Sequence, residues 1–137
     1  MGGRWRSRQR PVPTAFERRR AFRRGHLAET AATWLLRCKG YRIVARRVRT
    51  PLGEIDIIAR RGRTIAFVEV KERPTQASAL EAVSPRQARR LVGAARYWLT
   101  TQPPGATVQA DWRFDIVLVS PYLVPRHLPN AFGADLW

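Results

Sequence analysis

The chain has 137 residues, 45% of them hydrophobic, which predicts a single globular domain with a real core. Its formal net charge of +16 predicts a polyanionic partner. Of the two common polyanions, nucleic acid is favoured over an anionic membrane surface. We expect no membrane partner, because no stretch approaches the roughly 18 uncharged residues that a span requires. No signal peptide is recognisable, so a cytoplasmic location is expected.

The first 24 residues are strongly basic, with nine arginines against one acid. We predict a disordered basic arm over residues 1–14 and one folded domain over residues 15–137. The arm would contact phosphates without sequence preference, although a solvated tail with no binding role explains the same composition. The arginines expected to bind nucleic acid are Arg4, Arg6, Arg8, Arg10, Arg23 and Arg24.

A long helix is predicted from about Ala15 to Gly40, where glycine supplies a left-handed cap. Apolar residues recur there at three- and four-residue steps, which indicates one buried face. Glu29 lies off this stripe and is expected to point past the edge of the core. The stripe consists of Leu27, Ala28, Ala31, Trp34, Leu35 and Cys38.

Three strands are predicted to follow the helix. Residues Tyr41–Val48 alternate apolar and basic side chains, which is typical of an edge or half-buried strand. Residues Ile55–Ala59 and Thr64–Val70 are β-rich and separated by a four-residue loop, so we expect an antiparallel hairpin.

A second helix is predicted to begin at Ser84-Pro85, an N-cap followed by proline at the first helical position. Its apolar residues keep helical spacing from Ala88 to Leu99. Residues Arg113–Val119 form a final strand, and the tail from Pro121 is expected to wrap over the surface. The order helix, three strands, helix, strand predicts an α/β fold, with helices packed on a mixed β-sheet.

Acidic residues are scarce but concentrated on the predicted hairpin. The expected four-residue loop would set Glu69 diagonal to Asp56 on one face, with their Cβ atoms roughly 7 Å apart. Both carboxylates interrupt runs that resemble buried strand, where charge is costly and usually functional. Four of the chain's ten acids bracket the hairpin, namely Glu54, Asp56, Glu69 and Glu72.

A divalent cation is the natural partner of this carboxylate pair. Mg²⁺ (or Mn²⁺) binds one or two carboxylates and leaves its other positions to water and substrate phosphate. Lys71, on the same side as Glu69, is one of only two lysines among 26 basic residues. A lysine is a compact point charge that can orient a water or a phosphate. The alternative is a sheet edge whose acids simply pair with surface arginines.

Six short segments together carry a resemblance to a known family: Gly40–Ile43, Gly53–Ile58, Phe67–Lys71, Ala82–Pro85, Arg113–Val117 and Asn130–Phe132. The acid followed by acid-x-lysine resembles the PD-(D/E)xK motif of the restriction-endonuclease-like superfamily. The whole set, from about Arg24 to Phe132, resembles the YraN-like bacterial family within it.

This resemblance implies a restriction-endonuclease-like fold, shared with archaeal Holliday-junction resolvases, that builds a magnesium site. Carried over residue by residue, it implies Glu29, Asp56 and Glu69 as metal ligands and Asp56, Glu69 and Lys71 as catalytic residues. Two positions depart from the family. Gln87 stands where the family often has a lysine, and it is assigned as an auxiliary residue that can hydrogen-bond a phosphate or a water. Arg47 stands where the family often has an asparagine.

The function that these residues predict is metal-dependent endonucleolytic hydrolysis of phosphodiester bonds in nucleic acid, in DNA before RNA. Branched DNA is suggested as a substrate only by analogy with proteins of similar fold. The alternative is a non-catalytic nucleic-acid-binding protein that retains the nuclease fold, and a third interpretation is an accessory protein of ribosomal or other RNA. Resolvase-like chemistry would need a homodimer, which no sequence feature decides.

Several other residues are expected to be structural. Asp115 is predicted to form an ion pair beside the site rather than to bind metal. His26 and His127 are interpreted as surface or interface residues, and Cys38 as core packing. Among the tryptophans, only Trp5 in the basic arm is a candidate base contact.

Overall fold

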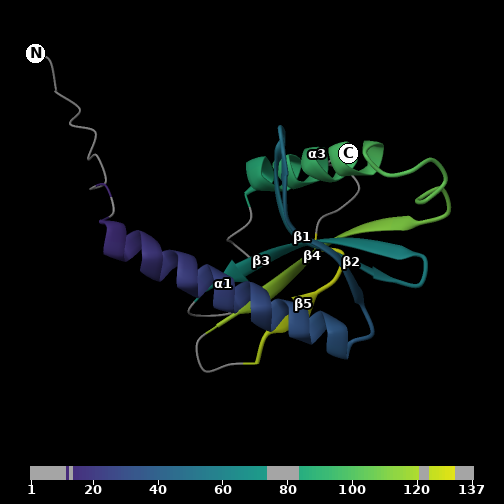
Figure 1. Ribbon diagram of the computed structural model, residues 1–137. Coiled ribbons are helices and arrows are strands. Elements are labelled where there is room, and N and C mark those ends of the chain that lie inside the picture. Colours follow the sequence, from purple (N-terminus) through teal and green to yellow (C-terminus); the bar gives the residue numbers. More distant parts are fainter. Residues whose placement is uncertain (1–11, 13, 74–83, 121–123, 132–137) are drawn as a thin grey trace, which may run out of the picture.

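The computed structural model describes residue 12 and residues 14–73, 84–120 and 124–131 (Figure 1). Most of the predicted arm, including Arg4, Arg6, Arg8 and Arg10, lies outside these residues, which contain only residues 12 and 14 of it. Arg23 and Arg24 fall within the first helix. The predicted element order is confirmed, with one further strand at the end. The elements are α1 (Ala15–Cys38), β1 (Arg42–Thr50), β2 (Gly53–Arg61), β3 (Thr64–Glu72), α3 (Pro85–Thr100), β4 (Asp111–Val119) and β5 (Arg126–Leu128).

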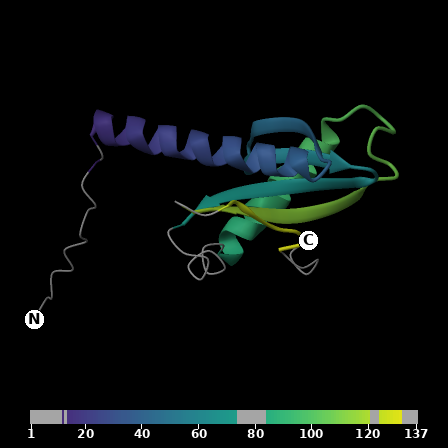
Figure 2. The same ribbon diagram turned by 90° about the horizontal axis from the view of Figure 1, so that it is seen from below.

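The strands form one five-stranded mixed sheet in the order β1-β2-β3-β4-β5. β3 and β4 are parallel, because α3 crosses over between them, and the other neighbours are antiparallel. In both views α1 covers one face of the sheet and α3 the other (Figures 1 and 2). This is the predicted α/β fold, consistent with a restriction-endonuclease-like sheet flanked by helices.

Each face of the sheet has its own apolar cluster, because successive strand side chains point to opposite sides. Ile58 and Phe67 pack against Leu91 of α3, whereas Ile57 and Val68 share a cluster with Leu36 of α1. The predicted apolar stripe of α3 is confirmed, since its buried residues are Ala88, Leu91, Val92, Ala94 and Ala95.

The buried face of α1 differs from the predicted stripe by a small rotation of the helix. Small residues such as Ala28 and Ala32 face the sheet, which lets the helix pack closely on it. Glu29 is therefore buried on the core face rather than off it. The predictions that Leu27, Trp34 and Cys38 pack in the core are wrong, since Leu27 is 71% exposed, Trp34 is 61% exposed and Cys38 is also exposed.

The turn between β2 and β3 is also tighter than predicted. It contains only Gly62 and Arg63, and Gly62 takes the positive φ of +59° that favours glycine. The ladder pairs Arg61 with Thr64 and ends at Ile57 and Val68. The predicted register, which would pair Asp56 with Phe67 and set Glu69 diagonal to Asp56, is therefore wrong, because Phe67 pairs with Ile58.

The tail after β4 adds a strand instead of only wrapping the surface. β5 pairs antiparallel with β4, with His127 opposite Val117. Neither of the helices in the described residues is long and apolar enough to cross a membrane.

Candidate active site

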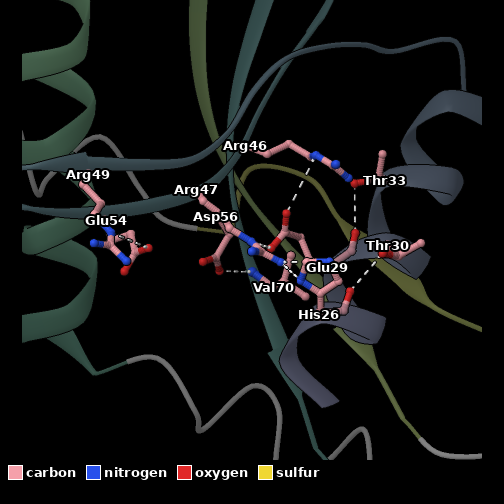
Figure 3. A network of polar contacts seen from close by, with 10 residues as sticks. All are labelled: His26, Glu29, Thr30, Thr33, Arg46, Arg47, Arg49, Glu54, Asp56 and Val70. Atoms are coloured by element: carbon pink, nitrogen blue, oxygen red, sulfur yellow. Dashed lines mark hydrogen bonds and ion pairs between the residues drawn. The ribbon is translucent and has the colours of Figure 1, made fainter. Parts of the chain in front are cut away.

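The candidate site lies where β2 and β3 stop pairing through their backbones. Beyond the Ile57–Val68 pair, the backbone amide of Val70 donates its hydrogen bond to Oδ2 of Asp56 over 2.8 Å. A side chain thus replaces the missing ladder bond. Figure 3 shows this contact, which holds the Asp56 carboxylate at the backbone of Val70. Two further residues of the candidate site flank Val70 on β3.

Those flanking residues are Glu69 and Lys71, which the alternation of β3 places on one side of the strand. The Lys71 Nζ lies 3.2 Å from Oε1 of Glu69. The lysine side chain is only 12% exposed and that of Glu69 24% exposed, so this ion pair is largely withdrawn from water. The structure therefore brings Asp56, Glu69 and Lys71 together, as the sequence predicted.

The two carboxyl groups of the site interact with each other, and both pKa values are raised. Burial and the charge of Asp56 together raise the pKa of Glu69 to about 7, although the charge of Lys71 opposes the rise. Burial is also the main cause of the raised pKa of Asp56, against the lowering effect of the Val70 amide. The pair therefore holds a proton at mildly acidic pH and would favour a cation between its oxygens.

Glu29, the third predicted metal ligand, reaches this region from α1 but is paired with arginine. Nε of Arg47 donates to Oε2 of Glu29 over 2.7 Å, and Nε of Arg46 lies 3.9 Å from Oε1 (Figure 3). Arg47 also contacts His26. Burial raises the pKa of Glu29, Arg46 lowers it, and the charge of Asp56 raises it.

The carboxylates near the site provide few ligands for a divalent metal. Among the described residues, no group of three or more His, Cys, Asp or Glu side chains is arranged to hold one. The predicted ligands divide into a close pair, Asp56 and Glu69, and a third carboxylate engaged by Arg47. Two adjacent carboxylates with raised pKa values still fit Mg²⁺, which needs only one or two protein carboxylates. Metal binding stays a prediction.

Gln87, the predicted auxiliary residue, lies in the first turn of α3 and is exposed. Its backbone amide donates to Oγ of Ser84 over 3.2 Å, which confirms the predicted N-cap. Within the described part of the chain, no hydrogen bond or ion pair joins its side chain to the carboxylate pair. An auxiliary role for Gln87 would depend on bound substrate.

A second polar network surrounds Asp115, which is fully buried. Arg113 donates to both of its carboxylate oxygens over 2.8 Å, and the Asn130 amide donates over 2.9 Å. Nε2 of His127 lies 2.7 Å from Oδ2 of Asp115, while its Nδ1 lies 2.6 Å from Nζ of Lys39. An ammonium can only donate, so Nδ1 accepts and Nε2 carries the proton toward Asp115.

This network confirms the predicted ion pair of Asp115 and corrects the interpretation of His127. The side chain of His127 is 2% exposed, so it is a core histidine rather than a surface one. Despite burial, the hydrogen bonds from His127 and Arg113 lower the pKa of Asp115 to about 2. The Arg113-x-Asp115 spacing on one strand face is the sequence signal for this pair, whereas the contribution of His127 needed the unexpected β5.

The model of a family described as "Uncharacterised protein family UPF0102" matches residues 28–119. A UPF0102 protein of Rhodopseudomonas palustris (strain BisB5) is 50% identical over 129 residues, covering 94% of this chain and 97% of that protein. A UPF0102 protein of Chelativorans sp. (strain BNC1) is 51% identical over 117 residues, covering 85% and 93% of the two chains. The matched region contains Glu29, Asp56, Glu69 and Lys71.

Proposed function

The chain belongs to the uncharacterised protein family UPF0102, and from that premise we propose that it is a metal-dependent nuclease that hydrolyses phosphodiester bonds in DNA. The observation that carries the proposal is the largely buried set of Asp56, Glu69 and Lys71 on one hairpin. Membership of the restriction-endonuclease-like superfamily, and kinship with archaeal Holliday-junction resolvases, belong to the same proposal.

Asp56 and Glu69 would hold Mg²⁺ or Mn²⁺. The ion supplies Lewis acidity toward a phosphate oxygen and toward water. The protein's own contribution is to keep two carboxylates together although their charges repel. The Val70 amide fixes Asp56, and Lys71 offsets part of the negative charge on Glu69.

Lys71 is proposed to act on the reacting phosphate. Its ammonium has three donors and lies 3.2 Å from one oxygen of Glu69, which leaves other donors for a water or a phosphate oxygen. A positive charge held in a partly dehydrated site stabilises developing negative charge more than it would in water. Lys71 would therefore orient the attacking water or stabilise the charge that builds on the phosphate.

The basic surface supports DNA as the partner. The formal net charge of +16 would favour association with a polyanion and make binding strongly dependent on salt. No element of the described residues points to base-specific readout, so DNA structure or ends are the proposed target. A homodimer in the cytoplasm is the proposed form, since paired cuts on branched DNA need two sites.

The second candidate function is DNA binding without cleavage, with the nuclease fold retained. Two observations favour it. Arg47 engages Glu29, and Gln87 stands where the family often has a lysine. A site with two carboxylates and no third acidic ligand among the described residues could bind metal too weakly to cut.

Cleavage assays separate the two candidates. Single-stranded, duplex and branched DNA, and RNA, are incubated with Mg²⁺ or Mn²⁺ and the wild-type protein, Asp56→Ala or Lys71→Ala. The nuclease proposal expects cleavage of a DNA substrate by the wild type and its loss in both variants. Glu54→Gln, an exposed acid two residues from Asp56, is the matched control and should cut normally. Cleavage that survives both variants would assign the activity elsewhere, and binding without any cleavage would favour the second candidate.

A further inference from the structure

A surface hollow of about 490 Å³ lies between the β1–β2 turn and the outer face of α3. It is lined by Leu52, Arg86, Arg89, Arg90 and Gly93, and is called here the α3 arginine groove. Figure 1 shows the β1–β2 hairpin standing beside the first half of α3. The groove therefore combines three arginines with an apolar wall formed by Leu52 and Gly93.

The groove is a consequence of how closely the turn approaches the helix. A Cβ atom at Gly53 would lie 3.2 Å from the carbonyl oxygen of Arg90, and one at Gly93 would touch Leu52 at 3.5 Å. Gly53 also has a φ of +155°, which a side chain would rarely adopt. The backbone of the turn therefore lies directly on α3, with Leu52 over Gly93.

The three arginines share one face of α3 because they stand at spacings of three and four residues. Leu91 and Val92 occupy the opposite, buried face. Arg86 and Arg90 are about 6 Å apart along the helix axis, because each residue adds a rise of 1.5 Å. Successive phosphates of one DNA strand advance about 3.4 Å along the duplex axis, so the row matches about two phosphate steps.

The charge of the groove is not neutralised by the described residues. Arg89 donates through Nε to the carbonyl oxygen of Pro85 over 3.3 Å, a contact with a neutral group. Within the described part of the chain, neither Arg86 nor Arg90 forms an ion pair, and no acid lines the groove. Three guanidinium groups held together repel one another, and bound anions would relieve that repulsion.

The groove also lies near the carboxylate site. Gly53, in contact with Arg90, precedes Asp56 by three residues on β2, roughly 10 Å along the strand. We propose that the α3 arginine groove holds backbone phosphates of DNA that lie a few nucleotides from the phosphate at Asp56, Glu69 and Lys71. The choice of DNA rests on the proposed function. The phosphate-binding role rests on the groove itself.

Binding assays in EDTA test the groove without cleavage. Fluorescence anisotropy of labelled duplex DNA is measured with the full chain over a range of salt concentrations. The variant Arg86→Ala/Arg89→Ala/Arg90→Ala is expected to bind at least about tenfold more weakly at 0.1 M salt. The slope of log K against log salt concentration should fall by about 2.7, at 0.9 for each lost phosphate contact.

A matched variant removes the same charge elsewhere. Arg37→Ala/Arg42→Ala/Arg63→Ala takes three exposed arginines from the end of α1, the start of β1 and the β2–β3 turn. It should bind within about threefold of the wild type, because these positions lie outside the groove. Equal losses in the two triple variants would overturn the proposal, since they would show only the effect of bulk charge.

Gly93→Glu gives a second variant that removes no arginine. It adds one negative charge to the floor of the groove, and its Cβ would make only an ordinary contact with Leu52. Glutamate also has a better helix propensity than glycine, so the fold should persist. We expect DNA affinity to fall while the thermal midpoint is no lower than that of the wild type, and unchanged affinity would count against the groove.

The outcomes separate this proposal from the nuclease proposal. If the wild type binds DNA through the groove but cuts no substrate, the groove proposal is supported and the nuclease proposal is rejected. A wild type that cuts, with an unchanged KM in the groove variant, would reject the groove alone. Tighter binding of duplex RNA than of DNA, lost in the same variant, would overturn the assignment to DNA.

Discussion

The carboxylate of Asp56 on β2 accepts the backbone hydrogen bond of Val70 on β3, over 2.8 Å. This single contact occupies the position where the ladder between the two strands has ended. It sets a carboxylate next to Glu69 and Lys71, which flank Val70 on its own strand. The end of strand pairing therefore creates the site, since a continuous ladder would have used the Val70 amide.

Lys71→Ala is expected to lower cleavage by about 10² to 10³-fold, the typical effect of removing one group that stabilises developing charge. Lys71→Arg should be nearly as harmful, because the site is largely buried and a planar guanidinium cannot replace a compact ammonium. The chain's other lysine gives the control, and Lys39→Arg should cut normally. A Lys71→Ala protein with more than a tenth of wild-type activity would refute this role.

Mg²⁺ should raise the thermal midpoint of the wild-type protein, because a ligand that binds the folded state stabilises it. At a hundredfold excess over Kd the gain is about 2.7 kcal/mol. Asp56→Asn should abolish the shift, since it removes one of the two carboxylates. Glu54→Gln, an exposed acid on the same strand, should keep it. Differential scanning calorimetry with and without Mg²⁺ measures the shift in thermal midpoint of the wild type and of each variant. A shift in Asp56→Asn equal to that of the wild type would place the metal elsewhere.

Stability without metal should depend on pH through Glu69. Its folded-state pKa of about 7 lies above the unfolded value of 4.5, so the folded protein binds the extra proton between these values. The free energy of unfolding should therefore fall as pH rises from 4.5 to 7, by up to about 3 kcal/mol. Stability above pH 7 should no longer change through this group.

Glu69→Gln is the test of that dependence. Urea unfolding in EDTA between pH 4.5 and 8 should give a flatter profile for this variant than for the wild type. Asp115 does not interfere, because its pKa of about 2 makes it titrate below this window. Identical profiles for the two proteins would contradict the raised pKa.

Arg47→Asn is expected to strengthen metal binding by about three- to tenfold, since the number of charged ligands tunes affinity. The substitution removes the 2.7 Å ion pair and leaves Glu29 available beside Asp56. Arg47 has a φ of +51°, a conformation that asparagine adopts more readily, so the backbone should tolerate the change. Arg46→Asn removes only the 3.9 Å contact and serves as the control. Titration calorimetry with Mn²⁺ measures both, and weaker binding in Arg47→Asn would show that Glu29 takes no part.

Asp115→Asn should lower the free energy of unfolding by about 2 to 4 kcal/mol, because Arg113 and His127 would lose a charged partner in the buried network. Asp111→Asn, at the exposed start of the same strand, should change it by less than about 0.5 kcal/mol. Urea unfolding at pH 7 compares the two. A small effect of Asp115→Asn, together with lost cleavage, would instead assign Asp115 to the site.

Local chemistry made several features predictable from the sequence. Proline after Ser84 and the left-handed Gly40 mark helix ends because few other residues fit those backbone positions. The length of the β2–β3 turn was not predictable in the same way. Arg60 and Arg61 are compatible with a loop, yet they extend β2 and shift the register by two residues.

The face of α1 was equally ambiguous, since an alanine-rich helix presents two overlapping apolar stripes. Packing against the sheet selects the smaller residues and buries Glu29, while Trp34 remains exposed. This choice depends on the distance between helix and sheet, which no local pattern encodes.

By itself, the sequence determined the α/β element order and the set of Asp56, Glu69 and Lys71, because hydrophobic period and strand alternation are local properties. Only the tertiary structure decided that Asp56 takes the Val70 amide, that Arg47 engages Glu29, and that His127 completes the shell of Asp115. It alone also placed Leu52 on α3 to form the arginine groove. Each of these contacts joins residues from different elements, and their geometry follows from register and packing rather than from spacing along the chain.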